Sequence, residues 1–447
     1  MLVSCFAIIC LACPSLASAA SRPVIVDTDL GSSADDNFAL ALALASKHLD
    51  VLLVVVTSGD TLSSARVASR QLRESGRADV PIAIGLTPPD ANTSVSLRAW
   101  AAAESLDERH HTVEYDGPRA MADLLMKSSP GSVDLLVLGP SSTVAAMLRR
   151  FPQAARGARA IVTGTTLCSG DFLPESVGEV TDVSAAKDIA EAEWGGGLVY
   201  VPWNVGASAV VQDEHWNDFR NVAKGRAGES SGGRRQMAAR AALDAFEAWR
   251  TVALFDRTSP FHELCANNDP NVRSIPMYDA ATVAMLSNEE GAFFDVVPAS
   301  VGFDDTGRTR MNLLARAPRL CSCDSCVVDR STIVQGGSYL KNADVASGWT
   351  ATGIEEFQRA FVDAFARAEE HRLTGTVRVI SVVFCALLSF ATLLAGCNIL
   401  RRYVIEKKAF DVKHALFDGG IVIGTPSPDP SASCTRKCCN APVVEAV

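Results

Sequence analysis

Short, almost continuous apolar runs recur along the chain and alternate with segments in which apolar residues follow a helical period. Such runs are typical of strands that are buried on both faces, because a half-exposed strand alternates apolar and polar positions. Strands separated by helices usually form a parallel sheet. The sequence therefore predicts an α/β fold, an open, mostly parallel sheet flanked by helices on both faces. The predicted strands are residues 23–27, 51–57, 80–85, 133–138, 159–163, 198–202 and, later, 294–304.

Two later segments have the composition of helices. Residues 234–256 are rich in helix-forming residues and carry an apolar stripe, and residues 354–373 read as a final amphipathic helix. The aromatic residues of the first segment are expected to pack in the core rather than to bind a ligand; they are Phe246, Trp249 and Phe255.

Both ends of the chain carry apolar segments typical of membrane targeting. Residues 1–20 include Ala17-Ser18-Ala19, which fits the cleavage pattern of a secretory signal peptide. Residues 379–400 contain no charged side chain, and at about 1.5 Å per residue they could cross a bilayer core of about 30 Å. Basic residues follow at once, which places the C-terminal side in the cytoplasm. A buried core helix is the alternative interpretation of this segment.

These features predict a single-pass type I membrane protein whose catalytic domain lies outside the cytosol. The tail is rich in Pro, Ser and Ala after Gly424, which is typical of a disordered segment. The predicted parts are a signal peptide (1–20), an ectodomain (21–375), a transmembrane helix (376–400) and a cytoplasmic, largely disordered tail (401–447).

Composition limits the classes of function. Of the 447 residues, 48% are hydrophobic, and the formal net charge is −10 at pH 7. No stripe of basic residues with interleaved aromatics occurs, so the sequence gives no sign of nucleic-acid binding.

Four carboxylates crowd the junction between the first predicted strand and the helix that follows it. Asp27, Asp29, Asp35 and Asp36 lie within ten residues, with Gly31 at the turn. Open α/β sheets bind ligands at the carboxyl ends of parallel strands, and like charges this close repel unless a cation lies among them. Oxygen donors without His or Cys favour a hard cation such as Ca²⁺. Helix capping is the alternative, but it accounts for only one or two of the four.

The stretch DTDLGSSADD, residues 27–36, resembles the opening motif DTDxGxDxDD of the inosine-uridine-preferring nucleoside hydrolase family. Residues 133–152, 158–171 and 275–286 resemble later segments of the same family in the same order. The resemblance covers roughly residues 22–370. It implies a nucleoside hydrolase-like fold and a small-molecule nucleoside as the substrate, and relatives of this fold commonly form homo-oligomers.

The resemblance also implies a set of site residues. Asp29 would be the general base and a Ca²⁺ ligand, and Asp35 would hold a ribose hydroxyl. Tyr278 takes the place of a His that helps the base to leave in some family members. Asp27 would orient the loop. The implied metal ligands are Asp29, Asp36, Asp279 and the backbone carbonyl of Ser142.

The sugar and base contacts depart from the family pattern. Asp60 replaces one of the Asn residues that usually contact the ribose. Either Glu175 or Glu179 aligns with the family's carboxylate in the later sugar-binding stretch, and no Asn aligns there. Asn204 lies where the family often has Asp. Tyr, with a pKa near 10, is a poorer acid than His at neutral pH.

The resemblance favours a membrane-anchored, calcium-dependent hydrolase that cleaves the N-glycosidic bond of a ribonucleoside to ribose and free base. The altered ribose contacts favour an alternative, a catalytically degenerate relative that binds calcium and a ribosyl ligand at the cell surface. A different hydrolase on the same scaffold is a third hypothesis.

Overall fold

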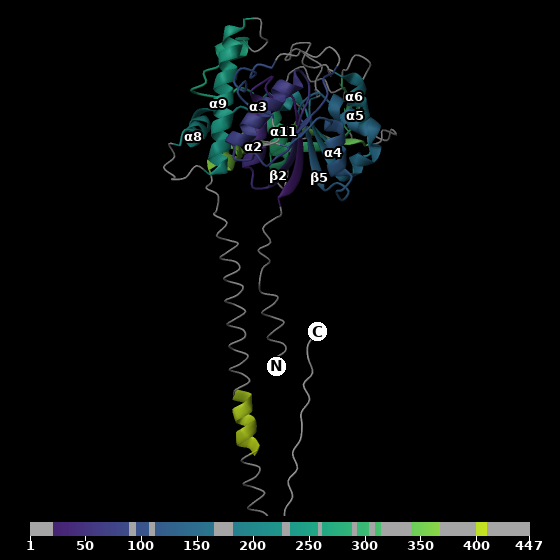
Figure 1. Ribbon diagram of the computed structural model, residues 1–447, viewed down its shortest axis with the longest axis vertical. Helices are drawn as coiled ribbons and strands as arrows, with labels where there is room; N and C mark the ends of the chain where they lie inside the picture. The colour runs from purple at the N-terminus through teal and green to yellow at the C-terminus, as the bar shows by residue number, and fades with distance from the viewer. Residues whose placement is uncertain are drawn as a thin grey trace, which may run out of the picture. The chain divides into compact units, whose positions relative to one another are not determined.

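The computed structural model describes residues 21–88, 95–106, 112–164, 182–225, 233–257, 262–287, 293–303, 309–313, 341–366 and 399–408. The chain divides into two units, Met1–Glu370 and His371–Val447. All the described strands, and every described helix except residues 399–408, belong to the first unit. In Figure 1 the sheet of this unit lies between two groups of helices.

The described strands form a single ten-stranded sheet in the order β4-β3-β2-β1-β5-β6-β7-β10-β8-β9. Pairing is parallel from β4 through β10, and the last two pairings, β10 with β8 and β8 with β9, are antiparallel. The strands are β1 (Arg22–Thr28), β2 (Leu49–Val56), β3 (Ile82–Ile84), β4 (Val113–Glu114), β5 (Val133–Val137), β6 (Ala158–Thr163), β7 (Leu198–Val201), β8 (Phe294–Phe303), β9 (Thr309–Leu313) and β10 (Ala343–Trp349).

Helices cover both faces of this sheet. On one face, Val24 and Val26 of β1 share a core with α2, α3, α8, α9, α11 and α12. On the other face, Ile25 shares a second core with α4, α5, η1 and α6. The helices are α2 (Asp35–Ala45), α3 (Thr61–Glu74), α4 (Gly117–Leu125), α5 (Ser142–Arg150), η1 (Pro152–Gly157), α6 (Val183–Glu191), α7 (Trp203–Gly206), α8 (Asp213–Ala223), α9 (Arg234–Phe255), α10 (His262–Asn267), α11 (Tyr278–Ser287) and α12 (Gly353–Ala366).

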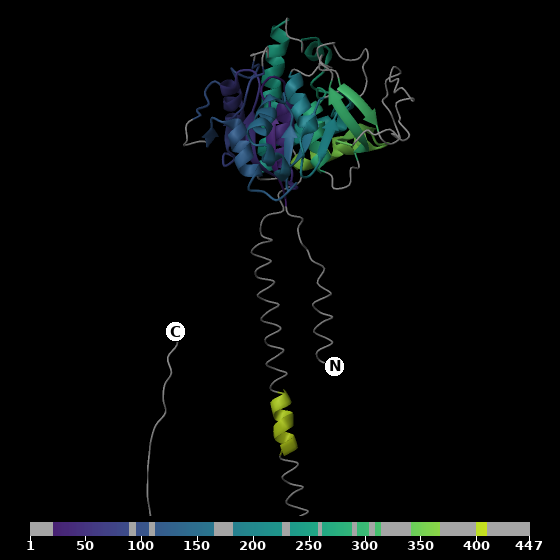
Figure 2. The same cartoon turned by 90° about the vertical axis from the view of Figure 1, so that its right-hand side faces the viewer.

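The order of strands places a switch point beside β1. The chain leaves β1 for β2 on one side, and later adds β5 and β6 on the other. Helices α2 and α3 therefore lie on the opposite face from α5 and α6, as Figures 1 and 2 show. Ligands of such sheets bind in the crevice at the carboxyl ends of the two strands that flank this point.

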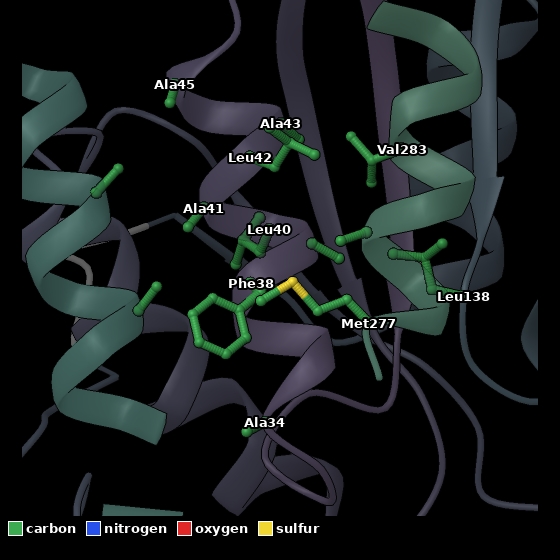
Figure 3. Packing of buried hydrophobic residues seen from close by; sticks show 14 of the residues in the cluster. Ala34, Phe38, Leu40, Ala41, Leu42, Ala43, Ala45, Leu138, Met277 and Val283 are labelled. Atoms are coloured by element: carbon green, nitrogen blue, oxygen red, sulfur yellow. The ribbon is translucent and has the colours of Figure 1, made fainter. Parts of the chain in front are cut away.

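Helix α2 is almost entirely buried, which fixes the position of its N-terminus. Its apolar residues pack between α9 and α11, and Figure 3 shows Phe38 beside Met277, which precedes α11. The Phe38 ring lies 6.0 Å from the Trp216 ring and 5.8 Å from the Phe219 ring, centroid to centroid, in edge-to-face contacts. A helix that is apolar all round has to be buried, and this one holds the acidic residues of its first turn in a rigid frame.

The predicted α/β fold is confirmed, since each of the seven predicted strand regions contains a strand. The helix predicted at 234–256 is α9, in which Phe246 and Trp249 are buried as expected. Phe255, the last residue of α9, is 86% exposed, so its predicted burial is wrong. Strands β4, β9 and β10 were not predicted, because β4 has only two residues and because β9 and β10 lack a continuous apolar run.

The predicted fold class needs one correction, the transmembrane helix. No helix within the described ranges is long and apolar enough to cross a membrane. Apart from its last two residues, the predicted span 376–400 lies outside the described residues. Those two residues begin an exposed helix, residues 399–408, which contains four basic residues and Glu406. On this finding, the predictions of a C-terminal transmembrane helix and of a single-pass type I membrane protein are wrong. The predicted signal peptide, 1–20, and tail residues 409–447 lie outside the described residues.

A buried carboxylate links three neighbouring strands near their amino-terminal ends. Asp134 of β5 is 2% exposed and pairs with Arg22 of β1 at 2.9 Å and with Arg159 of β6 at 2.7 Å. We expect Asp134→Ala to lower the free energy of unfolding by about 2 kcal/mol, because two partly buried guanidinium groups lose their partner. Urea denaturation measures this. Asp123→Ala, which breaks an exposed pair with Arg119, is the control and should cost under about 0.5 kcal/mol. Equal losses in the two variants would contradict the expectation.

Candidate active site

The loop after β1 carries the first carboxylates of the site. The chain turns at Gly31, whose φ of +96° is left-handed, and a Cβ there would lie 3.0 Å from Val95 Cγ1. Glycine adopts this conformation without strain. The Ser32 N–H donates to the Asp29 carbonyl, and the Ser32 hydroxyl donates to the Asp29 carboxylate at 3.0 Å. The turn leads directly into the first turn of α2.

Helix α11 supplies a carboxylate that is distant in sequence. Asp279 lies in the first turn of α11, which packs against α2 (Figure 3). One carboxylate oxygen each from Asp35, Asp36 and Asp279 lies within 4.8 Å of the others, and all three residues are buried. We call these three residues and Asp29 the acidic cluster. The partial positive charge at two helix N-termini favours carboxylates here.

Hydroxyl groups orient the cluster. Thr28 at the end of β1 donates from Oγ1 to Asp36 Oδ1 at 2.8 Å. Ser33 donates to Asp35, and the Thr163 hydroxyl at the end of β6 donates to Thr282 Oγ1 of α11 at 2.7 Å. The charges that act on Asp36 are those of other carboxylates.

Burial and mutual repulsion disfavour the ionised cluster. Burial, followed by the charges of Asp29, Asp279 and Asp35, raises the pKa of Asp36 well above its usual range. Burial is also the main cause that raises the pKa of Asp279, and it raises the pKa of Asp35 to about 6. A cation among these groups would replace repulsion by attraction. The oxygen-only donor set therefore fits a hard metal ion, and the buried triad Asp35, Asp36 and Asp279 could hold one.

Asp27 lies in β1, directly before these residues. Its carboxylate is buried, and neither oxygen has a hydrogen-bond partner within the described residues. Burial, followed by the charge of Asp29, raises its pKa well above the usual range. Its backbone carbonyl accepts from the N–H groups of Leu138 and Gly139. The backbone of Asp27 thus joins the end of β1 to the loop after β5.

Ser142 begins α5 after that second loop. Gly139 permits the close approach of this loop, since a Cβ there would lie 2.8 Å from the Asp29 backbone nitrogen. The Ser142 hydroxyl donates to Asp182 Oδ2 at 2.7 Å, and Asp182 also accepts from the Ala185 N–H at the start of α6. Sequence reasoning missed Asp182, because nothing local marks a contact across 40 positions.

An aromatic pair borders the cluster. Tyr278 precedes Asp279, and burial, with a smaller effect from the charge of Asp35, raises the pKa of its phenol. Its ring centroid lies 5.6 Å from that of Trp203, the first residue of α7 after β7. Asn204 follows Trp203 and is half-buried. Three of the predicted site residues, Tyr278, Asp279 and Asn204, thus come from α11 and α7, two helices in contact.

The remaining predicted sugar contacts are Asp60 and either Glu175 or Glu179. Asp60 caps α3, accepting from the Ser63 N–H at 3.2 Å, and pairs with Arg98 at 2.9 Å. No contact with the acidic cluster is seen for Asp60 among the described residues. Glu175 and Glu179 lie outside the described residues.

A mostly parallel sheet with buried carboxylates at its switch point is typical of α/β proteins that bind a small ligand at the carboxyl ends of their strands, and these carboxylates could hold a metal ion. The model of the inosine-uridine preferring nucleoside hydrolase family matches residues 24–351. The chain therefore belongs to this family, as its opening motif predicts.

Two curated relatives match about a third of the chain. The chain is 30% identical over 169 residues to the pyrimidine-specific ribonucleoside hydrolase RihA of Salmonella arizonae. This match covers 34% of this chain and 51% of that protein. The chain is also 28% identical over 165 residues to the non-specific ribonucleoside hydrolase RihC of Salmonella agona. This match covers 35% of this chain and 53% of that protein. The chain thus spans about half the length of the curated relatives it matches.

Solved structures match over most of their length. A plant nucleoside hydrolase has a TM-score of 0.53 at 17% identity, covering 77% of this chain and 99% of that one. A purine-preferring ribonucleoside hydrolase from Gardnerella vaginalis has a TM-score of 0.53 at 16% identity, covering 78% and 100%. At this identity the likeness establishes the fold.

Proposed function

We propose that this protein hydrolyses the N-glycosidic bond of a ribonucleoside, releasing ribose and the free base, with Ca²⁺ bound in the acidic cluster. The observation that carries the proposal is the convergence of buried carboxylates from α2 and α11, whose burial and mutual charge raise the pKa values of Asp36 and Asp279 in the absence of a cation. Carboxylate and carbonyl oxygens suit Ca²⁺. The residues that would hold the ion are Asp29, Asp36, Asp279 and, through its backbone carbonyl, Ser142.

The chemistry divides among the residues of the cluster. When bound, Ca²⁺ would lower the pKa of a water molecule and bind the vicinal hydroxyls of the ribose. Asp29 takes the proton of the attacking water as general base. Asp35 accepts a hydrogen bond from a ribose hydroxyl. The water oxygen bonds to C1′ as the C1′–N bond breaks with its electron pair going to the base. The departing base takes a proton from solvent, and Asp29 afterwards releases the proton of the water to solvent.

Tyr278 assists the leaving base as a hydrogen-bond donor. Burial and the charge of Asp35 raise its pKa, so the phenol stays protonated at neutral pH. Its O–H can then stabilise charge that develops on the base, although a full proton transfer from Tyr is less favourable than from His. Asn204 and Glu175 or Glu179 remain predicted contacts of the sugar.

A second candidate function is binding of a ribosyl ligand without turnover. The observation that favours it is the engagement of Asp60, which replaces a family Asn and is occupied by Ser63 and Arg98. A sugar contact would have to compete with these bonds.

Ribose release separates the two candidates. The full-length chain is incubated with inosine, uridine, adenosine, guanosine and cytidine, in Ca²⁺ or in chelator, and free ribose is assayed. We expect ribose in Ca²⁺ and a loss of at least about 100-fold in chelator. Calorimetric titration with Ca²⁺ shows that the protein is folded and competent. Calcium binding without release of ribose would favour the second candidate function, binding without turnover. Equal turnover in Ca²⁺ and in chelator would show that the reaction does not need a metal.

A further inference from the structure

A cavity of about 580 Å³ lies between helix α3 and the segment 95–106. The charged and hydroxyl side chains that line it are Asp60, Ser63, Arg66, Arg98, Glu104 and Ser105. None of these residues belongs to the acidic cluster, and the hydrolytic chemistry above does not use the cavity.

Contacts between paired side chains hold the segment 95–106 on α3. The Arg70 guanidinium lies 4.0 Å from the centre of the Trp100 ring and donates to the Trp100 carbonyl. Further along α3, Arg73 pairs with Glu104. The two walls of the cavity are thus fixed relative to each other, and a preformed cavity lowers the ordering cost that a ligand pays on binding.

Arg66 differs from the other arginines of α3. Arg70 and Arg73 each form an ion pair with a carboxylate. Among the described residues the side chain of Arg66 has neither an ion pair nor a hydrogen bond, although the residue is half-buried. A guanidinium is always charged and carries five N–H donors, so its burial without a partner costs free energy. An anion in the cavity would supply the missing partner.

Arg98 brings a second guanidinium to the cavity. Its Nη2 donates to Asp60 at 2.9 Å, and this is its one ion pair among the described residues. Other N–H donors of the same group remain for a ligand. The carboxylates that line the cavity are already neutralised, Asp60 by Arg98 and Glu104 by Arg73. With Arg66, three guanidinium groups act on two carboxylates, so the cavity carries net positive charge and attracts anions.

We propose that this cavity binds the phosphate group of a small phosphorylated metabolite between Arg66 and Arg98. A guanidinium can hold two phosphate oxygens at once, which makes arginine well suited to phosphate. Since a water molecule occupies about 30 Å³ in the liquid, a cavity of about 580 Å³ has room for a phosphate and an organic group. Its hydroxyl groups and Glu104 suit an organic group that itself carries hydroxyls. The site does not depend on the proposed function, because its residues lie outside the acidic cluster.

Calorimetric titration of the calcium-free, full-length protein with glycerol 3-phosphate tests this site. Calcium is omitted because phosphate binds the ion itself, and glycerol 3-phosphate has no ribosyl group for the active site. Inorganic phosphate and uncharged glycerol are titrated in parallel at an ionic strength of about 0.15 M, which screens non-specific attraction. We expect glycerol 3-phosphate to bind with a Kd below about 1 mM, more tightly than inorganic phosphate, and glycerol not to bind.

The two phosphate probes separate two sources of the same group. Tighter binding of inorganic phosphate would support the phosphate site and make the free ion its ligand. No binding of either probe up to about 10 mM would overturn the inference.

Substitutions of single arginines locate the site. Arg66→Gln and Arg98→Gln should each weaken glycerol 3-phosphate binding by about tenfold or more, because charge-assisted hydrogen bonds are lost. Arg66→Lys keeps the charge without the planar fork and should lie between. The control is Arg240→Gln, which removes the same charge from α9, where the Arg240 side chain is 76% exposed. Its affinity should match that of the unsubstituted protein.

The melting temperature of Arg66→Gln checks that the protein is folded, and it should not change, since the Arg66 side chain has no partner to lose among the described residues. Unchanged affinity in Arg66→Gln would overturn the inference. An equal loss in Arg240→Gln would also overturn it, because the overall charge of the protein, and not the cavity, would then attract the anion.

Discussion

Asp279→Asn is expected to reduce kcat/KM for ribose release by about 10³-fold or more, because one substitution removes a metal ligand and lowers the negative charge of the site. Asp279 is buried, and one of its carboxylate oxygens lies within 4.8 Å of those of Asp35 and Asp36. Asp29→Asn should cause a loss at least as large, since it removes the proposed base as well as a ligand. Initial rates at saturating Ca²⁺ measure both effects.

Asp279→Asn should stabilise the calcium-free protein, although it lowers the activity of the calcium-bound one. In chelator, Asp279→Asn relieves repulsion among buried carboxylates, so the melting temperature of the calcium-free protein should rise, although the rate at saturating Ca²⁺ falls. Asp123→Asn on the exposed surface of α4 is the control and should change neither quantity. If Asp279→Asn kept more than about a tenth of the rate at saturating Ca²⁺, the assignment of the acidic cluster as the active site would be refuted.

Apolar runs allowed most of the sheet to be predicted, because parallel strands buried on both faces need continuous hydrophobic sequence. The segment ADVASGW of β10 has small and polar residues, and its place between β7 and β8 depends on partners far away in sequence. Phe255 is exposed because α9 ends there, which helical periodicity does not reveal.

Part of the site could also be predicted from the sequence, whereas contacts between distant segments could not. The motif at residues 27–36 placed four carboxylates near one turn, and the resemblance of residues 275–286 to a later family segment implied Asp279 as a further ligand. The structure brings Asp279 to Asp35 and Asp36 through packing of α11 on α2, which no local pattern reveals. The ion pair of Asp60 could not be predicted from the sequence, since Arg98 reaches it from a separate segment. The position of Trp203 could not be predicted either, because it depends on glycines at 164 and 206.

The stability of the calcium-free protein is expected to fall as pH rises, opposite to the usual behaviour of a paired carboxylate. The pKa of Asp35 is about 6 in the folded chain, mainly because of burial, whereas an unfolded Asp has a pKa near 3.9. Between these values the folded state holds more protons than the unfolded state, so the free energy of unfolding decreases with pH. Asp35 alone accounts for about 3 kcal/mol across this window. Asp36 and Asp279, whose pKa values are also raised by burial and by neighbouring charges, add to the decline.

Calcium should reverse this loss, because a bound cation stabilises the ionised carboxylates that burial disfavours. At 100 times its dissociation constant, a ligand specific for the folded state adds about 2.7 kcal/mol. Denaturant titrations from pH 4 to 8, in chelator and in Ca²⁺, should therefore diverge as pH rises. Asp279→Asn in chelator should decline less steeply, since it removes one of the repelling groups. Parallel curves in chelator and Ca²⁺ would mean that no ion binds among these carboxylates, and the hydrolytic mechanism would then lose its metal.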